Sequence, residues 1–98
     1  MKLEEKISDR KIVYLFRREQ GIAFELAMLY FILAKRKNAA KKVAETCLKS
    51  VYWLKKAGVA IPDFLKRLSG FGQLEEIEKI LVLSKAKVDA RLSASGGH

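Results

Sequence analysis

Residues 22–34 read IAFELAMLYFILA, and Glu25 is their only charged side chain. On a helix the apolar side chains of this stretch would face every direction, which is typical of a helix inside a bundle or a membrane. A bilayer-spanning helix needs about 20 apolar residues, and Arg17, Arg18 and the Lys-Arg-Lys sequence at 35–37 flank the shorter stretch with charge. The stretch therefore predicts the central helix of a folded core. Glu25 is expected to reach solvent or pair with an arginine, because an unpaired buried charge is costly; a catalytic or ligand-binding carboxylate is the alternative.

The next stretch, residues 40–58, reads AKKVAETCLKSVYWLKKAG and predicts an amphipathic helix. At about 100° per residue, its apolar side chains fall in one sector, made of Ala40, Val43, Ala44, Cys47, Val51 and Leu54. The opposite side carries cations and aromatic rings, at Lys42, Lys49, Tyr52, Trp53 and Lys56. The helix is therefore expected to face the core with one side and a binding partner with the other.

The first helix and the junctions around the central helix are predicted from local signals. Ser8 and Asp9 suit a helix N-cap and an acidic first turn, so a first helix is expected from there, with residues 1–7 as a lead segment or an extra turn. Gly21 predicts a break or bend before the central helix. Asn38 is expected to cap the amphipathic helix.

The second half of the chain is predicted in the same way. Gly58 is expected to end the amphipathic helix as its C′ residue, and Pro62 suits the first turn of a short helix over residues 63–68. Residues 69–72, Ser-Gly-Phe-Gly, predict a loop whose phenylalanine plugs the core, or makes an external contact if it is exposed. A last helix is expected over residues 73–92, with one narrow apolar face.

Length and composition indicate a single all-α domain. The chain has 98 residues, 50% of them hydrophobic, and one Pro, which is enough for one core. Abundant Ala, Leu, Lys and Glu, without alternating apolar and polar runs, favour helices. We expect a compact bundle of four to five helices over residues 1–92 and a disordered tail over residues 93–98, because the tail is small and polar.

The positive charge of the chain is concentrated in its middle third. The formal net charge is +9, and residues 35–58 hold eight basic residues against Glu45 alone. Such a field favours a polyanionic partner, which is nucleic acid, an anionic membrane or an acidic protein surface. Lysines also cover the solvated faces of heat-adapted proteins, but those proteins usually balance lysine with glutamate.

The residue types needed for most active sites and metal sites are scarce. One Cys and one His, without CxxC or HExxH spacing, predict no metal site. Cys47 is expected to be a buried thiol without a base beside it, and the glycines of residues 69–72 lack the spacing of a phosphate-binding loop. We therefore expect a protein that is not an enzyme and has no catalytic residue, cofactor or small-molecule substrate.

The sequence favours a cytoplasmic location. One cysteine cannot form an internal disulfide, which fits a reducing compartment. The start, MKLEEKISD, has acidic residues where an export signal needs an apolar segment.

The cations and aromatic rings of the middle third form the predicted binding surface. Lysine and arginine would contact phosphates, which gives affinity without sequence information, or an acidic protein surface. The two aromatic rings would stack on an unpaired base, lie under the first or last helix of the bundle, or anchor a protein partner. The predicted residues are Lys35, Arg36, Lys37, Lys41, Lys42, Lys49, Tyr52, Trp53, Lys55 and Lys56.

A basic, Cys-poor helical chain of 98 residues resembles the small accessory subunits of archaeal replication and chromatin complexes, including those that associate with a family-B DNA polymerase. The resemblance is one of overall character across the whole chain. The defining residues of homeodomains, zinc fingers and KH domains are absent. The resemblance implies a protein without an active site that adjusts the stability or processivity of a larger enzyme.

Two functions follow as expectations, and a third is weaker. The first is a DNA-associated protein that contacts the phosphate backbone of DNA or RNA without sequence choice, or serves a larger nucleic-acid-processing enzyme as a subunit. The alternative is a protein adaptor or a self-associating helical module without nucleic-acid contact. The third is association with an anionic membrane through the same lysines.

Overall fold

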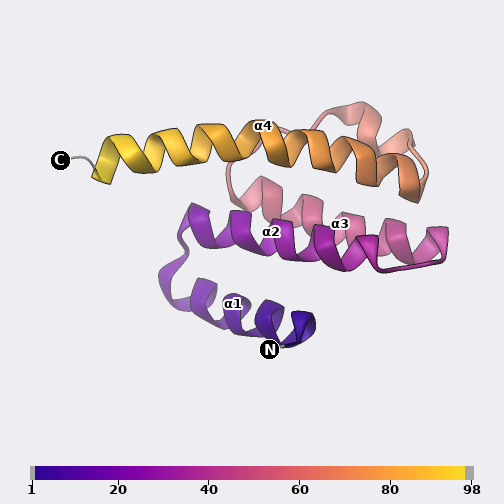
Figure 1. The fold of residues 1–98 in the computed structure, drawn as a ribbon, viewed down its shortest axis with the longest axis horizontal. Coiled ribbons are helices and arrows are strands. Elements are labelled where there is room, and N and C mark those ends of the chain that lie inside the picture. Colours follow the sequence, from indigo (N-terminus) through magenta and orange to yellow (C-terminus); the bar gives the residue numbers. More distant parts are fainter. Residues whose placement is uncertain (1, 97–98) are drawn as a thin grey trace.

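The computed structural model describes the backbone of residues 2–96 and the side chains of residues 2–87. These residues fold into four α-helices and one short 3-10 helix. The helices, in chain order, are α1 (Leu3–Arg17), α2 (Gln20–Lys35), α3 (Ala40–Lys56), the 3-10 helix η1 (Asp63–Arg67) and α4 (Gly70–Gly96). Figure 1 shows α2 and α3 in the middle of the bundle, with α1 on one side and α4 on the other. The predicted all-α bundle is confirmed.

Helix α2 is the centre of this bundle, as the apolar stretch predicts. Helices α1, α3 and α4 all pack against it, and it buries Ile22, Ala23, Phe24, Leu26, Ala27, Leu29, Tyr30 and Ala34. Glu25 forms an ion pair with Arg10 of α1, with 3.3 Å between Oε1 and Nε. The pairing expected for Glu25 is therefore confirmed, and its carboxylate stays partly exposed.

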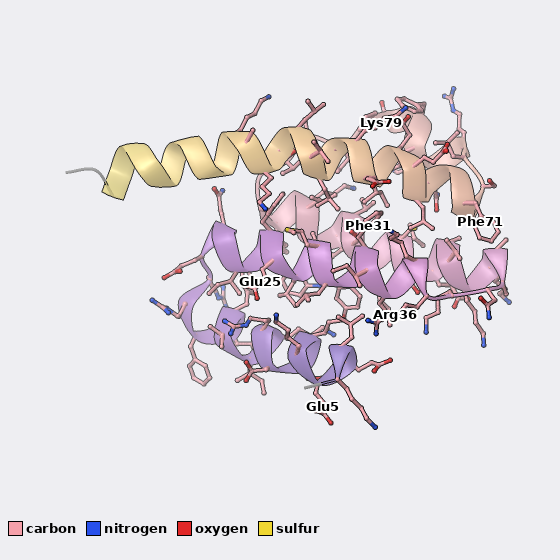
Figure 2. All side chains as sticks on the ribbon, viewed as in Figure 1. Glu5, Glu25, Phe31, Arg36, Phe71 and Lys79 are labelled. Atoms are coloured by element: carbon pink, nitrogen blue, oxygen red, sulfur yellow. The ribbon has the colours of Figure 1, made fainter. Side chains whose placement is uncertain are left out.

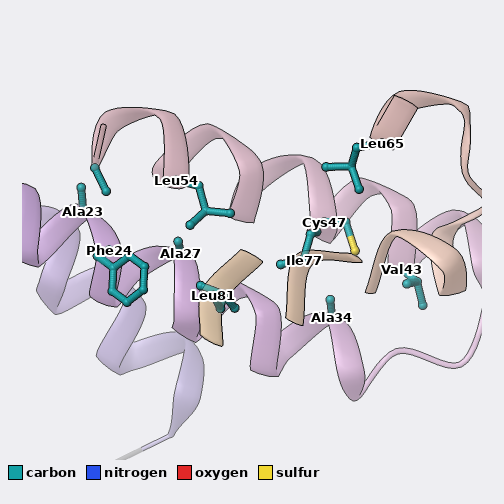
Figure 3. Close-up of a cluster of buried hydrophobic side chains, with 11 residues drawn as sticks. Ala23, Phe24, Ala27, Ala34, Val43, Cys47, Leu54, Leu65, Ile77 and Leu81 are labelled. Atoms are coloured by element: carbon teal, nitrogen blue, oxygen red, sulfur yellow. The ribbon is translucent and has the colours of Figure 1, made fainter. Parts of the chain in front are cut away.

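Helix α3 packs closely on α2 because α2 turns small side chains toward it. Ala23, Ala27 and Ala34 are fully buried, and Figure 3 shows the side chains of all three beside α3. The Ser50 hydroxyl of α3 donates a hydrogen bond to the main-chain oxygen of Ala27, at 2.8 Å. This bond satisfies a fully buried hydroxyl, which would be costly to leave without a partner.

Two groups of buried side chains form the core. The larger group joins α2, α3, η1 and α4 (Figure 3), and the smaller lies between α1 and α2. Tyr14 of α1 and Trp53 of α3 pack against both groups. Helix α1 is therefore attached to the bundle through α2 and through this aromatic pair.

Helix α1 begins before the predicted cap. It starts at Leu3, so Ser8 and Asp9 lie inside it and the N-cap predicted at Ser8 is wrong. The alternative of additional helix before Ser8 is the one that the structure shows. Ile7 is buried between α1 and α2. Burial of such a side chain contributes about 1.5–3 kcal/mol, more than the about 1 kcal/mol typical of an N-cap, which is why the helix continues through Ser8.

The breaks on either side of α2 fall next to the predicted positions. Helix α1 ends at Arg17, and the C-cap residue Arg18 has a left-handed φ of 48° and donates its backbone N–H to Tyr14 O at 2.8 Å. Gly21 lies within α2 and does not break it. Ala39 is the N-cap of α3 and has no side-chain acceptor to offer, so the cap predicted at Asn38 is wrong.

The second half of the chain agrees with the sequence at Gly58 and η1 and differs after them. Gly58 has a φ of 81° directly after α3, and η1 follows Pro62. The predicted loop at residues 69–72 is wrong: α4 begins at Gly70, and the Ser69 hydroxyl accepts a hydrogen bond from the Gly72 N–H at 3.3 Å. Ser69 therefore acts as a cap for a helix that starts earlier than predicted.

Phe71 does not plug the core, because it is 51% exposed at the start of α4 (Figure 2). Helix α4 runs to Gly96 and so includes residues 93–96 of the predicted tail. Residues 97 and 98 of that tail lie outside the described residues.

Candidate nucleic-acid interface

The solvent side of α3 carries five exposed lysines around one exposed tyrosine. At about 100° per residue, Lys42, Lys49 and Lys56 follow one edge of this side and Lys41 and Lys55 follow the other. Tyr52, 53% exposed, lies between the two edges. We call the five lysines the α3 basic face; they are Lys41, Lys42, Lys49, Lys55 and Lys56.

None of the lysines of the α3 basic face forms an ion pair in the described part of the chain, although the exposed Glu45 lies on the same side of the helix, one turn from Lys41, Lys42 and Lys49. Within residues 2–87, the ion pairs involve Arg10, Arg17 and Lys79 and none of the α3 lysines. Glu45 is the only acidic residue of α3. From Lys42 to Lys56 the face extends about 21 Å along the helix, at about 1.5 Å per residue. The arrangement is a linear array of ammonium groups, unpaired within residues 2–87, with one carboxylate among them, and its net charge of +4 can attract phosphates.

Trp53 has a structural role that its neighbours in the sequence do not reveal. It is half-buried, and its ring packs edge-on against Tyr14 of α1, with centroids 5.0 Å apart and planes at 86°. Helix α1 therefore covers it, which is one of the three roles left open by the sequence. Tyr52, whose ring lies 5.2 Å from that of Trp53, is the aromatic residue of the pair that faces solvent.

Helix α1 adds a cation to the α3 basic face that sequence reasoning missed. The Nζ atoms of Lys11 and Lys49 lie 5.4 Å and 5.9 Å from the ring centroid of Tyr30, a buried residue of α2. Each contact is a cation–π interaction worth about 0.5–1 kcal/mol at an exposed site. Two ammonium groups from different helices thus share one ring. Nothing in the sequence of α1 indicates which of its sides would lie beside α3.

The three basic residues at the end of α2 separate in the fold. Arg36 is exposed and Lys37 half-buried in the α2–α3 turn, next to the N-terminal end of α3, and Figure 2 labels Arg36 there. The Nζ of Lys35 lies 5.5 Å from the centroid of the Phe31 ring. Phe31 lines an apolar cavity between α2 and α4, so Lys35 belongs to that side of the bundle and not to the α3 basic face.

A pocket of about 220 Å³ lies between α3 and η1, and we call it the α3–η1 pocket. Tyr52 and Lys55 line it from α3, Lys66 lines it from η1, and Gln73 lines it from α4. The amide nitrogen of Gln73 donates to Leu65 O at 3.3 Å, while its Oε1 is buried without a hydrogen-bond partner. Sequence reasoning did not find this pocket, because Gln73 reaches it only when α4 packs on α3.

Cys47 lies at the inner wall of the α3–η1 pocket, 1% exposed. Its Sγ faces the Gly70 carbonyl oxygen at 4.0 Å. Removal from water disfavours the thiolate and raises the pKa of this thiol from 9.0 to about 11. The thiol is therefore protonated at neutral pH and is not an activated nucleophile.

The raised pKa of Cys47 predicts a specific loss of stability at high pH. Between pH 9 and about pH 11 the unfolded chain loses the thiol proton and the folded chain keeps it, so the free energy of unfolding falls as the pH rises. The free energy of unfolding should have its full value below pH 9 and be lower by about 2 kcal/mol at pH 11. Urea unfolding of wild type and of Cys47→Ala across this range isolates the effect from lysine and tyrosine titration. A constant difference between the two proteins over the range would contradict the prediction.

The described part of the chain contains neither a cluster of metal ligands nor a membrane-spanning helix. Residues 2–87 contain no group of three or more His, Cys, Asp or Glu side chains placed to hold a metal ion. None of the described helices is long and apolar enough to cross a membrane. A comparison with protein-family models, curated proteins and solved structures finds no match to this chain.

Proposed function

We propose that this protein is a non-catalytic, nucleic-acid-associated protein that holds the phosphate backbone of DNA or RNA on the α3 basic face. The observation that carries the proposal is the set of five exposed α3 lysines without carboxylate partners among residues 2–87. Lysine to phosphate contacts provide affinity through counterion release and carry no sequence information. Binding without sequence choice is the mode that such a face supports.

The same face suits a subunit of a larger DNA-processing enzyme. A short array of lysines beside a compact bundle would hold the nucleic acid near the enzyme that acts on it, which is the role implied by the resemblance to accessory subunits of family-B DNA polymerases. The free, buried Cys47 thiol is compatible with work in a reducing compartment such as the cytoplasm.

Charge reversal at Lys42 and Lys49 tests the proposal. The double variant Lys42→Glu, Lys49→Glu is expected to bind every sequence about 10²-fold more weakly at 0.1 M salt, because two phosphate contacts become repulsive. The slope of log K against log salt should become shallower by about 1.4–1.8, at about 0.7–0.9 per lost contact. Fluorescence anisotropy of labelled oligonucleotides over a salt series measures both quantities.

A matched control separates the face from the overall charge. Lys85→Glu with Lys87→Glu changes the net charge equally at exposed α4 positions without an ion pair among the described residues, and it should weaken binding much less. Equal losses in the two double variants would show that net charge alone attracts the nucleic acid. Undetectable or salt-insensitive binding by wild type would overturn the proposed function.

A protein adaptor is the second candidate, favoured by an apolar patch on α1. Ile12, Leu15 and Phe16 are 55%, 67% and 84% exposed, and their i, i+3, i+4 spacing puts them on one side of the helix. Exposed apolar side chains that gather on one face mark contact sites for other proteins. A protein held there would stay bound at high salt and after nuclease treatment, whereas nucleic acid on the α3 basic face would be released.

A further inference from the structure

The α3–η1 pocket has the size of a site for a single ring system. Its volume of about 220 Å³ is below the about 300–1,000 Å³ of pockets that take drug-sized ligands. Its inner wall is apolar, with Cys47, Val51 and Leu65 among its residues. A flat, mostly apolar ring system fits such a space, whereas a whole nucleotide or a cluster of bulky side chains does not.

One buried polar atom at the pocket has no partner within the described protein. Gln73 is 9% exposed, and its Nε2 is held by the hydrogen bond to Leu65 O. This bond fixes the orientation of the amide and leaves Oε1 as the unsatisfied acceptor. Buried polar atoms are nearly always hydrogen-bonded, and Gln73 lines the pocket. Oε1 itself has almost no solvent-accessible surface, so a ligand N–H would reach it through a small rotation of the Gln73 side chain. Nucleobases carry such donors on their ring and exocyclic nitrogens.

The mouth of the pocket offers an aromatic ring and two cations. Tyr52 is half-exposed, and its ring contacts the Lys56 ammonium, 5.5 Å from the centroid, and the edge-on Trp53 indole, 5.2 Å between centroids. Lys55 of α3 and Lys66 of η1 line the pocket, and Asp63 is the single acidic residue of its lining. A base in the pocket would therefore have a ring to stack on and ammonium groups for the phosphates on either side of it.

We propose that the α3–η1 pocket binds one unpaired nucleobase of a single strand. Tyr52 stacks on the base, Gln73 Oε1 accepts a hydrogen bond from a base N–H, and Lys55 and Lys66 contact the neighbouring phosphates. This inference rests on the proposed function and adds a preference for single strands, because the faces and Watson–Crick edges of bases in a duplex are occupied by neighbours. The lysines of the α3 basic face outside the pocket bind the phosphates of single and double strands equally.

Binding of labelled oligothymidine, of a duplex of the same length and of a base-free sugar-phosphate oligomer tests the pocket. Tyr52→Ala should weaken oligothymidine binding about 10-fold, as expected for one lost base–aromatic stack, and leave the duplex and the base-free oligomer unchanged. Tyr52→Phe keeps the ring and should bind like wild type. Gln73→Met keeps the volume, removes the acceptor and should also weaken oligothymidine binding alone.

The outcomes separate this inference from the proposed function. Equal affinity of wild type for single and double strands, with Tyr52→Ala unchanged on both, would overturn the base pocket and leave the α3 basic face standing. A Tyr52→Ala loss shared by the duplex or the base-free oligomer would also overturn the pocket. Absence of salt-dependent binding to any probe would overturn both. Tyr52 is exposed, so its variants report on binding even if Gln73→Met destabilises the fold.

Discussion

Replacing Gly70 with alanine is expected to lower the free energy of unfolding by about 3 kcal/mol. A Cβ atom at this position would lie 2.5 Å from Ala40 O, 3.0 Å from Ala44 N and 3.2 Å from Val43 Cβ. Two of these atoms belong to the main chain of α3, so neither can turn aside as a flexible side chain would. Relief requires α4 to move away from α3, and overpacking of this kind costs about 1–3 kcal/mol, occasionally more.

Gly72→Ala is the matched control for this prediction. It makes the same chemical change two residues later in α4, where a Cβ would make ordinary contacts at 3.4 Å from Leu68 Cβ and 3.5 Å from Ser69 Oγ. Because alanine favours a helix over glycine by about 0.5–1 kcal/mol, Gly72→Ala should be as stable as wild type or more so. Thermal unfolding followed by circular dichroism measures both variants, and the Gly70 variant should melt more than about 10 °C lower. Equal melting temperatures would show that α4 does not rest on α3 at this glycine.

Gly70 also shows why part of the fold could not be predicted from the sequence. Two glycines in four residues indicate a loop by local preference, whereas here Gly70 is required by the approach of α3, which is distant in the sequence. The elements that could be predicted are those with a signal inside their own residues. Residues 22–34, apolar apart from Glu25, identified α2, the one-sided pattern of residues 40–58 identified α3, and Gly58 marked where α3 ends.

The candidate site likewise has one part that the sequence predicts and another that depends on how the helices pack. The exposure of Lys42, Lys49 and Lys56 follows from the period of the helix, because the opposite side of α3 is apolar. Which of the adjacent residues Tyr52 and Trp53 is covered depends on where α1 lies, and no pattern within α3 contains that information. The contribution of α1 to the surface and that of α4 to the α3–η1 pocket are likewise products of helix packing.

Trp53→Ala is expected to lower the free energy of unfolding by about 3 kcal/mol, the low end of the range for removing a core tryptophan, because Trp53 is half-buried. Its ring packs against both groups of core side chains and against Tyr14, so its loss removes a contact that joins α1 to α3. The amides of α1 should lose protection from hydrogen exchange first. Urea unfolding followed by circular dichroism measures the stability, since the variant has no tryptophan fluorescence.

Two further variants decide whether the indole is a core residue or a surface contact. Trp53→Phe keeps an aromatic edge against Tyr14 and should recover more than half of the lost stability, because edge-to-face pairs contribute about 0.5–1.5 kcal/mol beyond their buried area. Tyr52→Ala removes the exposed neighbour and should cost less than about 1 kcal/mol. If Trp53→Ala were as stable as wild type and yet bound nucleic acid poorly, the indole would be the stacking residue and α1 would not cover it. We expect the reverse assignment: Trp53 holds α1 in place through its contact with Tyr14, and the exposed Tyr52 is the residue available to the proposed ligand.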